Sequence, residues 1–264
     1  MALVTNLQQN PSPFESVTKV GAYEPFNLQV ARGQIAGHSQ FLIYGYSNQV
    51  GNTAFGPLWE GLTQSGGLYP FPASAAQLTI VSSSASDTSA LKVLIQGLDA
   101  NFAPISEVIA LNGTSNVTSV NSYLRINSVS VTNGTNVGNI SFKQSTTLLA
   151  QINAGLGVNQ ASIYTVPAGY TLYILRSYKT ANIGFTSGAW INFEVLFNDN
   201  VTNAQKVVQE QTFVQQIEIN YEQMPRKITE KTDIQYLFKT STGGPLICSQ
   251  NLTGILIKND GQTA

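Results

Sequence analysis

The sequence predicts an all-β protein with three parts: an extended N-terminal arm (residues 1–27), an antiparallel β domain (28–145) and a β-sandwich (146–264). Short runs in which every second residue is apolar indicate strands. Turns rich in Gly, Asn and Asp separate these runs. Only 10% of the residues are charged although 42% are hydrophobic, which is typical of sheets whose outer faces carry amides and hydroxyls.

The first 27 residues are polar and interrupted by Pro11, Pro13 and Pro25, with no sustained period of 2 or 3.6. They contain more apolar side chains than a solvated tail needs, namely Phe14, Val17, Val20, Tyr23 and Phe26. The segment is therefore interpreted either as a frayed terminus or as an arm that docks on a neighbouring protein by adding a strand to it.

Two short strands are expected between Phe26 and Tyr46, separated by a bend at Gly33 to Gly37. His38 has no second His or thiolate nearby in the sequence, and a hydrogen-bonded turn residue is the favoured interpretation over a metal ligand. Residues 48–71 form a long Gly- and Pro-rich loop. Because loops of this length are usually functional, its aromatic residues are predicted to be interface anchors, namely Trp59, Tyr69 and Phe71.

The stretch from Leu91 to Val131 predicts an antiparallel meander of three strands. Leu91, Val93 and Ile95 alternate, residues 97–101 supply a turn, and residues 105–111 form the return strand. Asn112-Gly113 is a strong turn signal before a third strand over residues 123–131. Asp87, Asp99 and Asn101 in the loops offer oxygen ligands, but no calcium-loop motif is present.

The second half carries regularly spaced strands, for which a jelly roll is the preferred topology. Residues 146–157 are a linker, either a short helix or an extended strand. Tyr170 to Ile174 and Ile217 to Tyr221 show alternation, as do Ile234 to Phe238. The clearest half-buried strand is Ile191 to Phe197, and the last strand is Leu252 to Ile257.

Several stretches resemble a family of tailed-bacteriophage virion structural proteins common in marine phages and cyanophages. They are GLDANFAPISEVIALNGT, SYLRINSV, GGLYPFPASAAQLTIVSSSASD and YTVPAGYTLYILRS. The resemblance covers roughly Pro25 to Asp260. It implies a virion location and assigns no chemistry, cofactor or functional residue.

Charge and cysteine content restrict the function classes. A net charge of −1 with scattered basic residues disfavours nucleic-acid binding. Cys248 is the single cysteine, so no intrachain disulfide forms, and a buried structural thiol is favoured over a nucleophile. Residues 1–24 lack a signal-peptide pattern and no stretch is apolar for about 18 residues, so we expect no membrane insertion and synthesis in the host cytoplasm.

Catalysis is not expected. One His and one Cys, far apart in the sequence, give few ways to pair a nucleophile with a base, and motifs for phosphate or zinc chemistry are absent. No cofactor and no metal is therefore predicted. A glycosidase needs only two carboxylates, so that alternative stays open on the 14 Asp and Glu residues.

Two functions are compatible with this sequence. The first is a capsid decoration or cement protein that binds the shell as a homo-oligomer, with a trimer expected. The alternative is a tail fibre, adaptor or receptor-binding module that recognises a cell-surface glycan. A sugar site needs an exposed aromatic ring beside hydrogen-bonding side chains, and Trp190 with Asn192, or Tyr178 with Asn182, could supply one.

Overall fold

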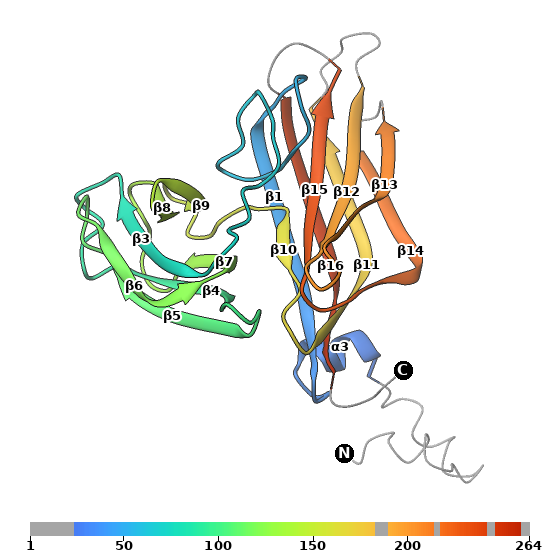
Figure 1. The fold of residues 1–264 in the computed structure, drawn as a ribbon, viewed down its shortest axis with the longest axis horizontal. Helices are drawn as coiled ribbons and strands as arrows, with labels where there is room; N and C mark the ends of the chain where they lie inside the picture. The colour runs from blue at the N-terminus through green and yellow to red at the C-terminus, as the bar shows by residue number, and fades with distance from the viewer. Residues whose placement is uncertain (1–23, 183–189, 214–216, 242–245, 260–264) are drawn as a thin grey trace.

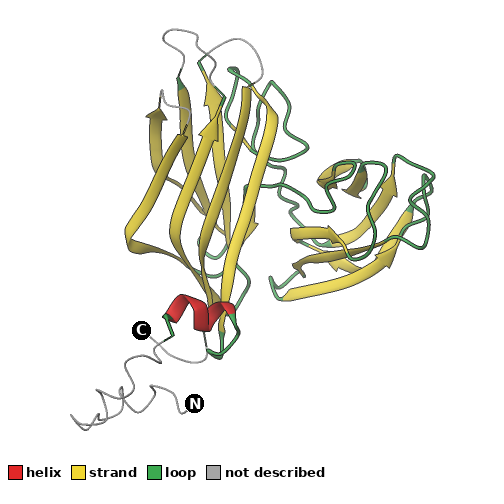
Figure 2. Cartoon of the chain, turned by 180° about the vertical axis from the view of Figure 1, so that it is seen from behind, coloured by secondary structure: helices red, strands yellow, loops and turns green. Residues whose placement is uncertain are grey.

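The computed structural model describes residues 24–182, 190–213, 217–241 and 246–259. The regular secondary structure of the described chain consists almost entirely of antiparallel strands, and its one named helix is the short α3 (Phe26–Ala31) (Figure 2). The all-β prediction is confirmed. Two β bodies lie side by side, a tall sandwich and a smaller unit next to one edge of it (Figure 1).

Eight of the described strands form the sandwich. They are β1 (His38–Val50), β10 (Ile163–Thr165), β11 (Tyr170–Ala181), β12 (Ile191–Asp199), β13 (Ala204–Phe213), β14 (Ile217–Ile228), β15 (Thr232–Thr240) and β16 (Leu246–Lys258). One sheet has the order β1-β16-β11-β14 and the other β10-β15-β12-β13, with the two-residue β2 (Gly56–Pro57) added to β15. Counted in chain order, the first of these eight strands pairs with the eighth, the second with the seventh, the third with the sixth and the fourth with the fifth. This nested pairing across two sheets is a jelly roll.

The sandwich core follows the alternation seen in the sequence. Ile191, Phe193 and Val195 of β12 are fully buried, while Asn192 and Glu194 point to the half-buried outer face. On β15, in contrast, both faces are buried, since Gln235 and Leu237 are buried as well as the residues that alternate with them. The reason is that β2 pairs with β15 and Tyr69 donates its backbone N–H to Gln235 Oε1, so the segment after β1 covers the outer face of β15.

The smaller unit is inserted into the jelly roll between β2 and β10. Its strands are β3 (Ala76–Ser82), β4 (Lys92–Leu98), β5 (Pro104–Ala110), β6 (Val117–Tyr123), β7 (Arg125–Val131), β8 (Ile140–Gln144) and β9 (Thr147–Ile152). They form a sheet of order β6-β3-β8-β9 and a sheet of order β5-β4-β7. Side chains from both sheets are fully buried, including Ile80, Ile95, Tyr123 and Phe142, so the inserted unit has a core of its own.

The strand pairing divides the chain differently from the predicted boundaries at residues 27/28 and 145/146. β1 belongs to the jelly roll because it pairs with β16, and the register joins His38 to Ile257. β9 falls in the predicted linker but pairs with β8 of the inserted unit. Alternation identifies a strand from its own residues, whereas its partner depends on residues far away in the sequence. The two-domain division in chain order is therefore wrong.

The predicted meander is correct in its first hairpin, and its third strand forms in the same sheet but beside β4 instead of β5. β4 and β5 pair through Gly97 and Ile105, and Asp99 Oδ1 accepts hydrogen bonds from the N–H groups of Asn101 and Ala103 in the connecting turn. Gly113 has the positive φ of 58° expected of a turn. However, β6 then crosses to the other sheet, and β7 pairs with the far side of β4.

The first predicted strand, after Phe26, is instead helix α3. The carbonyl of Pro25 accepts hydrogen bonds from the N–H groups of Leu28 and Gln29, which closes the first turn. A short apolar run fits either structure, and here local hydrogen bonding decides. Gly33 and Gly37, both with positive φ, form the expected bend into β1. Most of the predicted arm, with Phe14, Val17, Val20 and Tyr23, lies outside the described residues.

Candidate functional site

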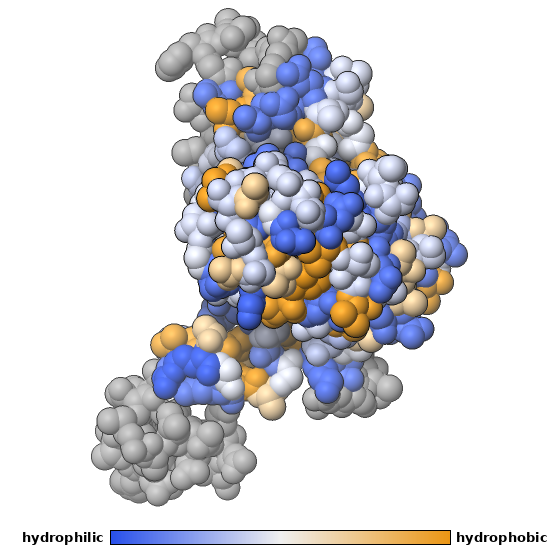
Figure 3. Space-filling model, turned by 90° about the vertical axis from the view of Figure 1, so that its left-hand side faces the viewer, coloured by the Kyte–Doolittle hydropathy of each residue, from blue (hydrophilic) through white to orange (hydrophobic). Residues whose placement is uncertain are grey.

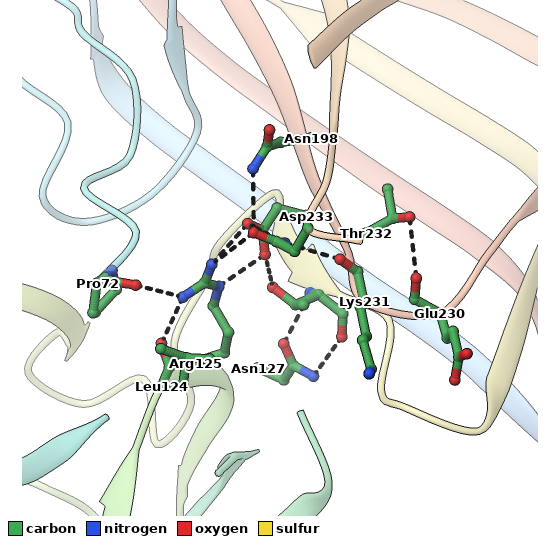
Figure 4. Close-up of polar contacts among 11 residues, drawn as sticks. Pro72, Leu124, Arg125, Asn127, Asn198, Glu230, Lys231, Thr232 and Asp233 are labelled. Carbon is green, nitrogen blue, oxygen red and sulfur yellow. Dashed lines mark hydrogen bonds and ion pairs between the residues drawn. The ribbon is translucent and has the colours of Figure 1, made fainter. Parts of the chain in front are cut away.

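The junction between the inserted unit and the jelly roll is organised by one buried ion pair. Arg125 at the start of β7 donates from Nε to Asp233 Oδ1 at 2.8 Å and from Nη2 to Asp233 Oδ2 at 2.9 Å. The side chains are 6% and 1% exposed. Figure 4 shows Arg125 reaching from the inserted unit toward Asp233 on β15 of the sandwich. A bidentate geometry of this kind fixes the orientation of the two partners as well as their distance.

The remaining hydrogen-bonding capacity of this pair is also used. Arg125 Nη1 donates to the carbonyls of Pro72 and Leu124 at 2.7 and 2.9 Å. Asp233 accepts further hydrogen bonds from Thr165 Oγ1 at 2.6 Å and Asn200 Nδ2 at 2.8 Å. The guanidinium also lies over the rings of Phe71 and Phe102, which belong to the connection and the inserted unit. Because every charge is paired, the desolvation cost of burying it is offset.

Two further contacts connect the bodies through backbone groups. Asn127 on β7 donates to the carbonyl of Thr165 at 2.9 Å and accepts from its N–H at 3.0 Å, so the side chain replaces a strand partner for β10. At the base of the insertion, Ser162 N–H donates to the carbonyl of Leu58 at 2.8 Å, and Leu58 N–H donates to Ser162 Oγ at 2.9 Å. The two ends of the inserted segment are thus held next to each other.

Glu60 is a partly buried carboxyl group at the same junction. Its Oε1 accepts a hydrogen bond from the backbone N–H of Gln160, whereas Oε2 is buried without a hydrogen-bond partner among the described residues. Burial raises the pKa of Glu60 from 4.5 to about 7, although hydrogen bonds from backbone N–H groups oppose this effect. The side chain lies beside Trp59, Tyr69 and Asn159 around a small internal cavity.

A groove of about 510 Å³ lies at the junction between the edge of the jelly roll and the sheet β5-β4-β7. Residues 39–43 of β1 form one wall together with Tyr164 and Tyr170. Residues 96–98 of β4 and 104–106 of β5 form the opposite wall. The described residues that line it are apolar or neutral polar, so the groove suits an uncharged ligand or an extended peptide.

The predicted interface anchors of the 48–71 loop are wrong as exposed anchors. Trp59 and Tyr69 are each only 7% exposed and Phe71 is half-buried. Their rings stack edge to face in a row, with centroids 5.1 Å apart for Trp59 and Tyr69 and 4.8 Å apart for Tyr69 and Phe71. Tyr69 also donates its hydroxyl to the carbonyl of Leu149 at 2.6 Å. These aromatics join the two bodies within one chain, and Trp59 and Tyr69 leave almost no surface for another protein.

Phe26 is the predicted arm residue that falls in the described chain. It is 44% exposed on α3 and packs edge to face on His38, with ring centroids 5.9 Å apart. His38 Nδ1 lies 3.0 Å from the carbonyl of Ala36, at the first residue of β1. The histidine is hydrogen-bonded as expected, although it begins a strand.

The glycan candidates occupy partly exposed positions in the jelly roll. Trp190 is half-buried before β12 and donates its backbone N–H to Ser241 Oγ at 2.8 Å. Asn192 accepts a hydrogen bond from Thr212 Oγ1 at 2.6 Å. Tyr178 is half-buried on β11 of the opposite sheet with the guanidinium of Arg176 6.0 Å from its ring, and Asn182 is exposed just after that strand. The two candidate pairs thus lie in different sheets.

The described residues contain no cluster of three or more His, Cys, Asp or Glu side chains that could hold a metal ion. Cys248 is fully buried on β16, where burial raises the pKa of its thiol to about 12. Asp87, a suggested oxygen ligand, instead accepts hydrogen bonds from Ser82 Oγ and from the N–H groups of Val137 and Gly138. Within the described segments, no helix is both long and apolar enough to cross a membrane.

Comparison with known proteins adds little to this geometry. No protein-family model matches the chain, and no curated protein matches it. Among solved structures, the infectious bursal disease virus Gx strain particle gives a TM-score of 0.22 at 12% identity, covering 99% of this chain and 80% of that chain. The VP2 subviral particle of the same virus gives 0.22 at 10% identity, covering 90% and 78%. Scores this low carry no argument about function.

Arg125, Asp233 and Glu60, which define the junction, are not among the site residues that the sequence predicts. A single charged residue at the edge of an apolar strand gives no local signal of its partner, since Arg125 and Asp233 lie 108 positions apart. One signal was available. In a chain with so few charges, a lone Arg or Asp inside a strand pattern is a candidate for a buried pair.

Proposed function

We propose that this chain is a non-enzymatic structural protein of a tailed-bacteriophage virion that decorates or cements the capsid shell as a homo-oligomer. The observation that carries the proposal is the jelly-roll topology, an architecture found in viral capsid and lectin domains. The resemblance of GLDANFAPISEVIALNGT and the other quoted stretches to virion proteins supports the same conclusion.

The construction of the molecule suits a fixed building block. The inserted unit lies next to one edge of the jelly roll. The buried ion pair Arg125–Asp233 and the Asn127–Thr165 hydrogen bonds hold it there. A rigid connection presents both bodies to partners in a constant geometry, which reduces the ordering cost of assembly.

The surface is compatible with extensive contact with other proteins. Apolar side chains gather on the face of the inserted unit that is turned away from the sandwich (Figure 3). Exposed apolar residues of this unit include Val108, Val120 and Val137, of which Val120 is 84% exposed. With few charges, such a surface loses little solvation energy when a partner covers it. The expected partners are the capsid shell and sister subunits.

Solution mass and copy number test this proposal. Light scattering of the purified protein should give a symmetric oligomer, with a trimer expected, and quantitative mass spectrometry of purified virions should give tens to hundreds of copies. A protein that stays monomeric at high concentration and occurs at a few copies per virion would contradict capsid decoration.

The second candidate is a tail fibre, adaptor or receptor-binding module for a cell-surface glycan. It is favoured by the partial exposure of Trp190, two residues before Asn192, and of Tyr178 on the strand that Asn182 follows, on a fold also used by lectins. The free protein should then compete with phage for adsorption to host cells. Trp190→Ala and Tyr178→Ala should each reduce that competition, whereas a decoration protein should not compete at all.

A further inference from the structure

Among the described strands, β1 is at the end of its sheet, whose order is β1-β16-β11-β14, so one of its edges has no strand partner there. Its odd-numbered residues bond to β16, as the hydrogen bond from Lys258 N–H to the carbonyl of Gly37 indicates. Its even-numbered residues point their N–H and C=O groups outward. At the two ends of the edge these groups are used, since His38 N–H donates to Ile35 and Tyr46 N–H donates to Gln160.

Between those two ends, the outward backbone groups of Gln40, Leu42 and Tyr44 bond to none of the described residues. Leu42 is 57% exposed. An unpaired strand edge of this kind is a template for an added strand, and proteins usually cover or charge it. Here the segment 40–44 carries no charged side chain, so nothing in its sequence opposes pairing.

The groove at the junction follows this edge. Side chains along a strand alternate between two faces, so a groove on one face would contact every second residue. The five consecutive residues 39–43 all line it, which places the groove along the backbone edge of β1. Its far wall, from β4 and β5, offers Leu98, Pro104 and Ile105 to a side chain of the incoming strand. The groove therefore combines free backbone groups with an apolar and neutral polar wall.

We propose that residues 2–8 of a second copy of this chain bind in the groove as an added β-strand on β1. This inference rests on the proposed role as a homo-oligomeric structural protein and names the contact between its subunits. The sequence Ala-Leu-Val-Thr-Asn-Leu-Gln is uncharged, matches the neutral groove, and places Leu3, Thr5 and Leu7 on one face of a strand. Pro11 and Pro13 then end the pairing.

The place where the described chain starts favours a second copy over the same chain. Glu24 lies just before α3, which crosses the base of the sandwich, and its start lies on the side away from the inserted unit in both Figures 1 and 2. The groove is on the other side, between β1 and that unit. Residues 9–23 can span roughly 50 Å when extended, which is enough to reach a neighbouring subunit.

Deletion and edge-blocking variants test the inference by solution mass. Removing residues 2–8 should convert the oligomer to a monomer and leave the thermal midpoint of the monomer nearly unchanged. Leu42→Pro should do the same, because proline removes an outward N–H that β16 does not use. Leu42→Ser is the matched control, since it keeps the N–H and should stay oligomeric.

A peptide of residues 2–8 gives a direct readout. It should bind to the protein that lacks residues 2–8, a scrambled peptide should not, and Leu42→Pro in that background should weaken binding by about tenfold or more, the value of one to two lost hydrogen bonds. An unchanged oligomer after the deletion would overturn the inference. So would a monomeric full-length chain whose groove already excludes the peptide, since its own N-terminus would then fill the site.

These outcomes are separable from the failure of the proposed function. Absence of the protein from purified virions would contradict the virion role without altering the solution mass of the purified chain. Conversely, a protein present in virions at high copy whose oligomer survives deletion of residues 2–8 would contradict the strand exchange alone.

Discussion

Arg125 and Asp233 connect two bodies through charges that are almost fully removed from solvent. Such a pair contributes little net stability compared with apolar residues of the same shape, because its attraction is offset by desolvation. Its effect is on geometry: the guanidinium and carboxylate hold β7 and β15 in one relative position. Removing one partner is costly because the other charge then stays buried and unpaired.

We therefore expect Arg125→Met to lower the free energy of unfolding by about 3 to 5 kcal/mol. The double variant Arg125→Met, Asp233→Leu should lose less free energy of unfolding than the two single variants lose together, since neither charge is then left buried without its partner. Urea unfolding of the four proteins measures this cycle. Strict additivity would show that the ion pair is not coupled across the junction.

Glu60 predicts a specific pH dependence. Because its pKa is raised from 4.5 to about 7, the folded protein binds the proton more tightly than the unfolded chain does. The stability that this group contributes is fully present below pH 4.5 and is lost as the pH rises to about 7. At about 1.4 kcal/mol per pKa unit, the loss is at most about 3.5 kcal/mol.

Glu60→Gln keeps the shape and removes the titration. The difference in unfolding free energy between Glu60→Gln and the parent protein should therefore grow in favour of the variant between pH 5 and pH 8. Chemical denaturation at the two pH values checks this, and the other carboxyl groups cancel in the comparison. An equal difference at both pH values would show that the carboxyl titrates normally.

At the scale of elements, the loops of the inserted unit depend on Asp87. Its carboxylate accepts hydrogen bonds from Ser82 and from the N–H groups of Val137 and Gly138, and its backbone carbonyl accepts from Gly113 N–H. Burial opposes ionisation of this carboxyl, but the hydrogen bonds outweigh burial and lower its pKa. One residue thus fixes three loops that join β3, β5 and β8 to their neighbours.

Asp87→Ala should destabilise the protein by about 2 kcal/mol or more, since three hydrogen bonds to a charged group are lost at a buried site. The matched control is Asp99→Ala, which removes two hydrogen bonds in the β4–β5 turn, a partly exposed site, and should cost about 1 kcal/mol. Thermal unfolding compares them. Equal losses would mean that Asp87 acts as an ordinary turn residue.

The elements also show what a single sequence can predict. The β4–β5 hairpin and the strand β12 follow from alternation and turn residues that are local, and both were predicted. The partners of β1, β7 and β9 depend on contacts that no local pattern contains, so alternation alone does not predict them. The aromatics Trp59 and Tyr69 were expected at a surface because their loop is long, whereas the inserted unit covers them. A site that forms where two bodies meet can be predicted only when the strand topology is already known.

At the scale of the molecule, the inserted unit is a separable addition to the jelly roll. Leu58 and Ser162 exchange two hydrogen bonds, so the chain enters and leaves the insertion at one place. We expect that replacing residues 59–161 by a two-glycine linker, together with Asp233→Asn, leaves a folded jelly roll. Circular dichroism and a cooperative thermal transition would verify it.

A further truncation of that variant, starting at residue 51, provides the contrast. It removes β1 as well, which leaves β16 with an unpaired edge and opens the sandwich. This shorter chain should not show a cooperative transition. If it folds as well as the variant that keeps β1, the strand is dispensable and its assignment to the jelly-roll core is incorrect.

The pairing of β1 with β16 has a consequence for how the protein forms in the cell. His38 faces Ile257 across the sheet, a separation of 257 − 38 = 219 positions. The ribosome therefore finishes the inserted unit, whose strands pair among residues 76–152, well before the jelly roll can close. Until β16 emerges, both edges of β1 are exposed to other nascent chains. Expression yield should therefore depend on chaperone supply and on slow translation of the last hundred or so codons, as expected for topologies dominated by distant contacts.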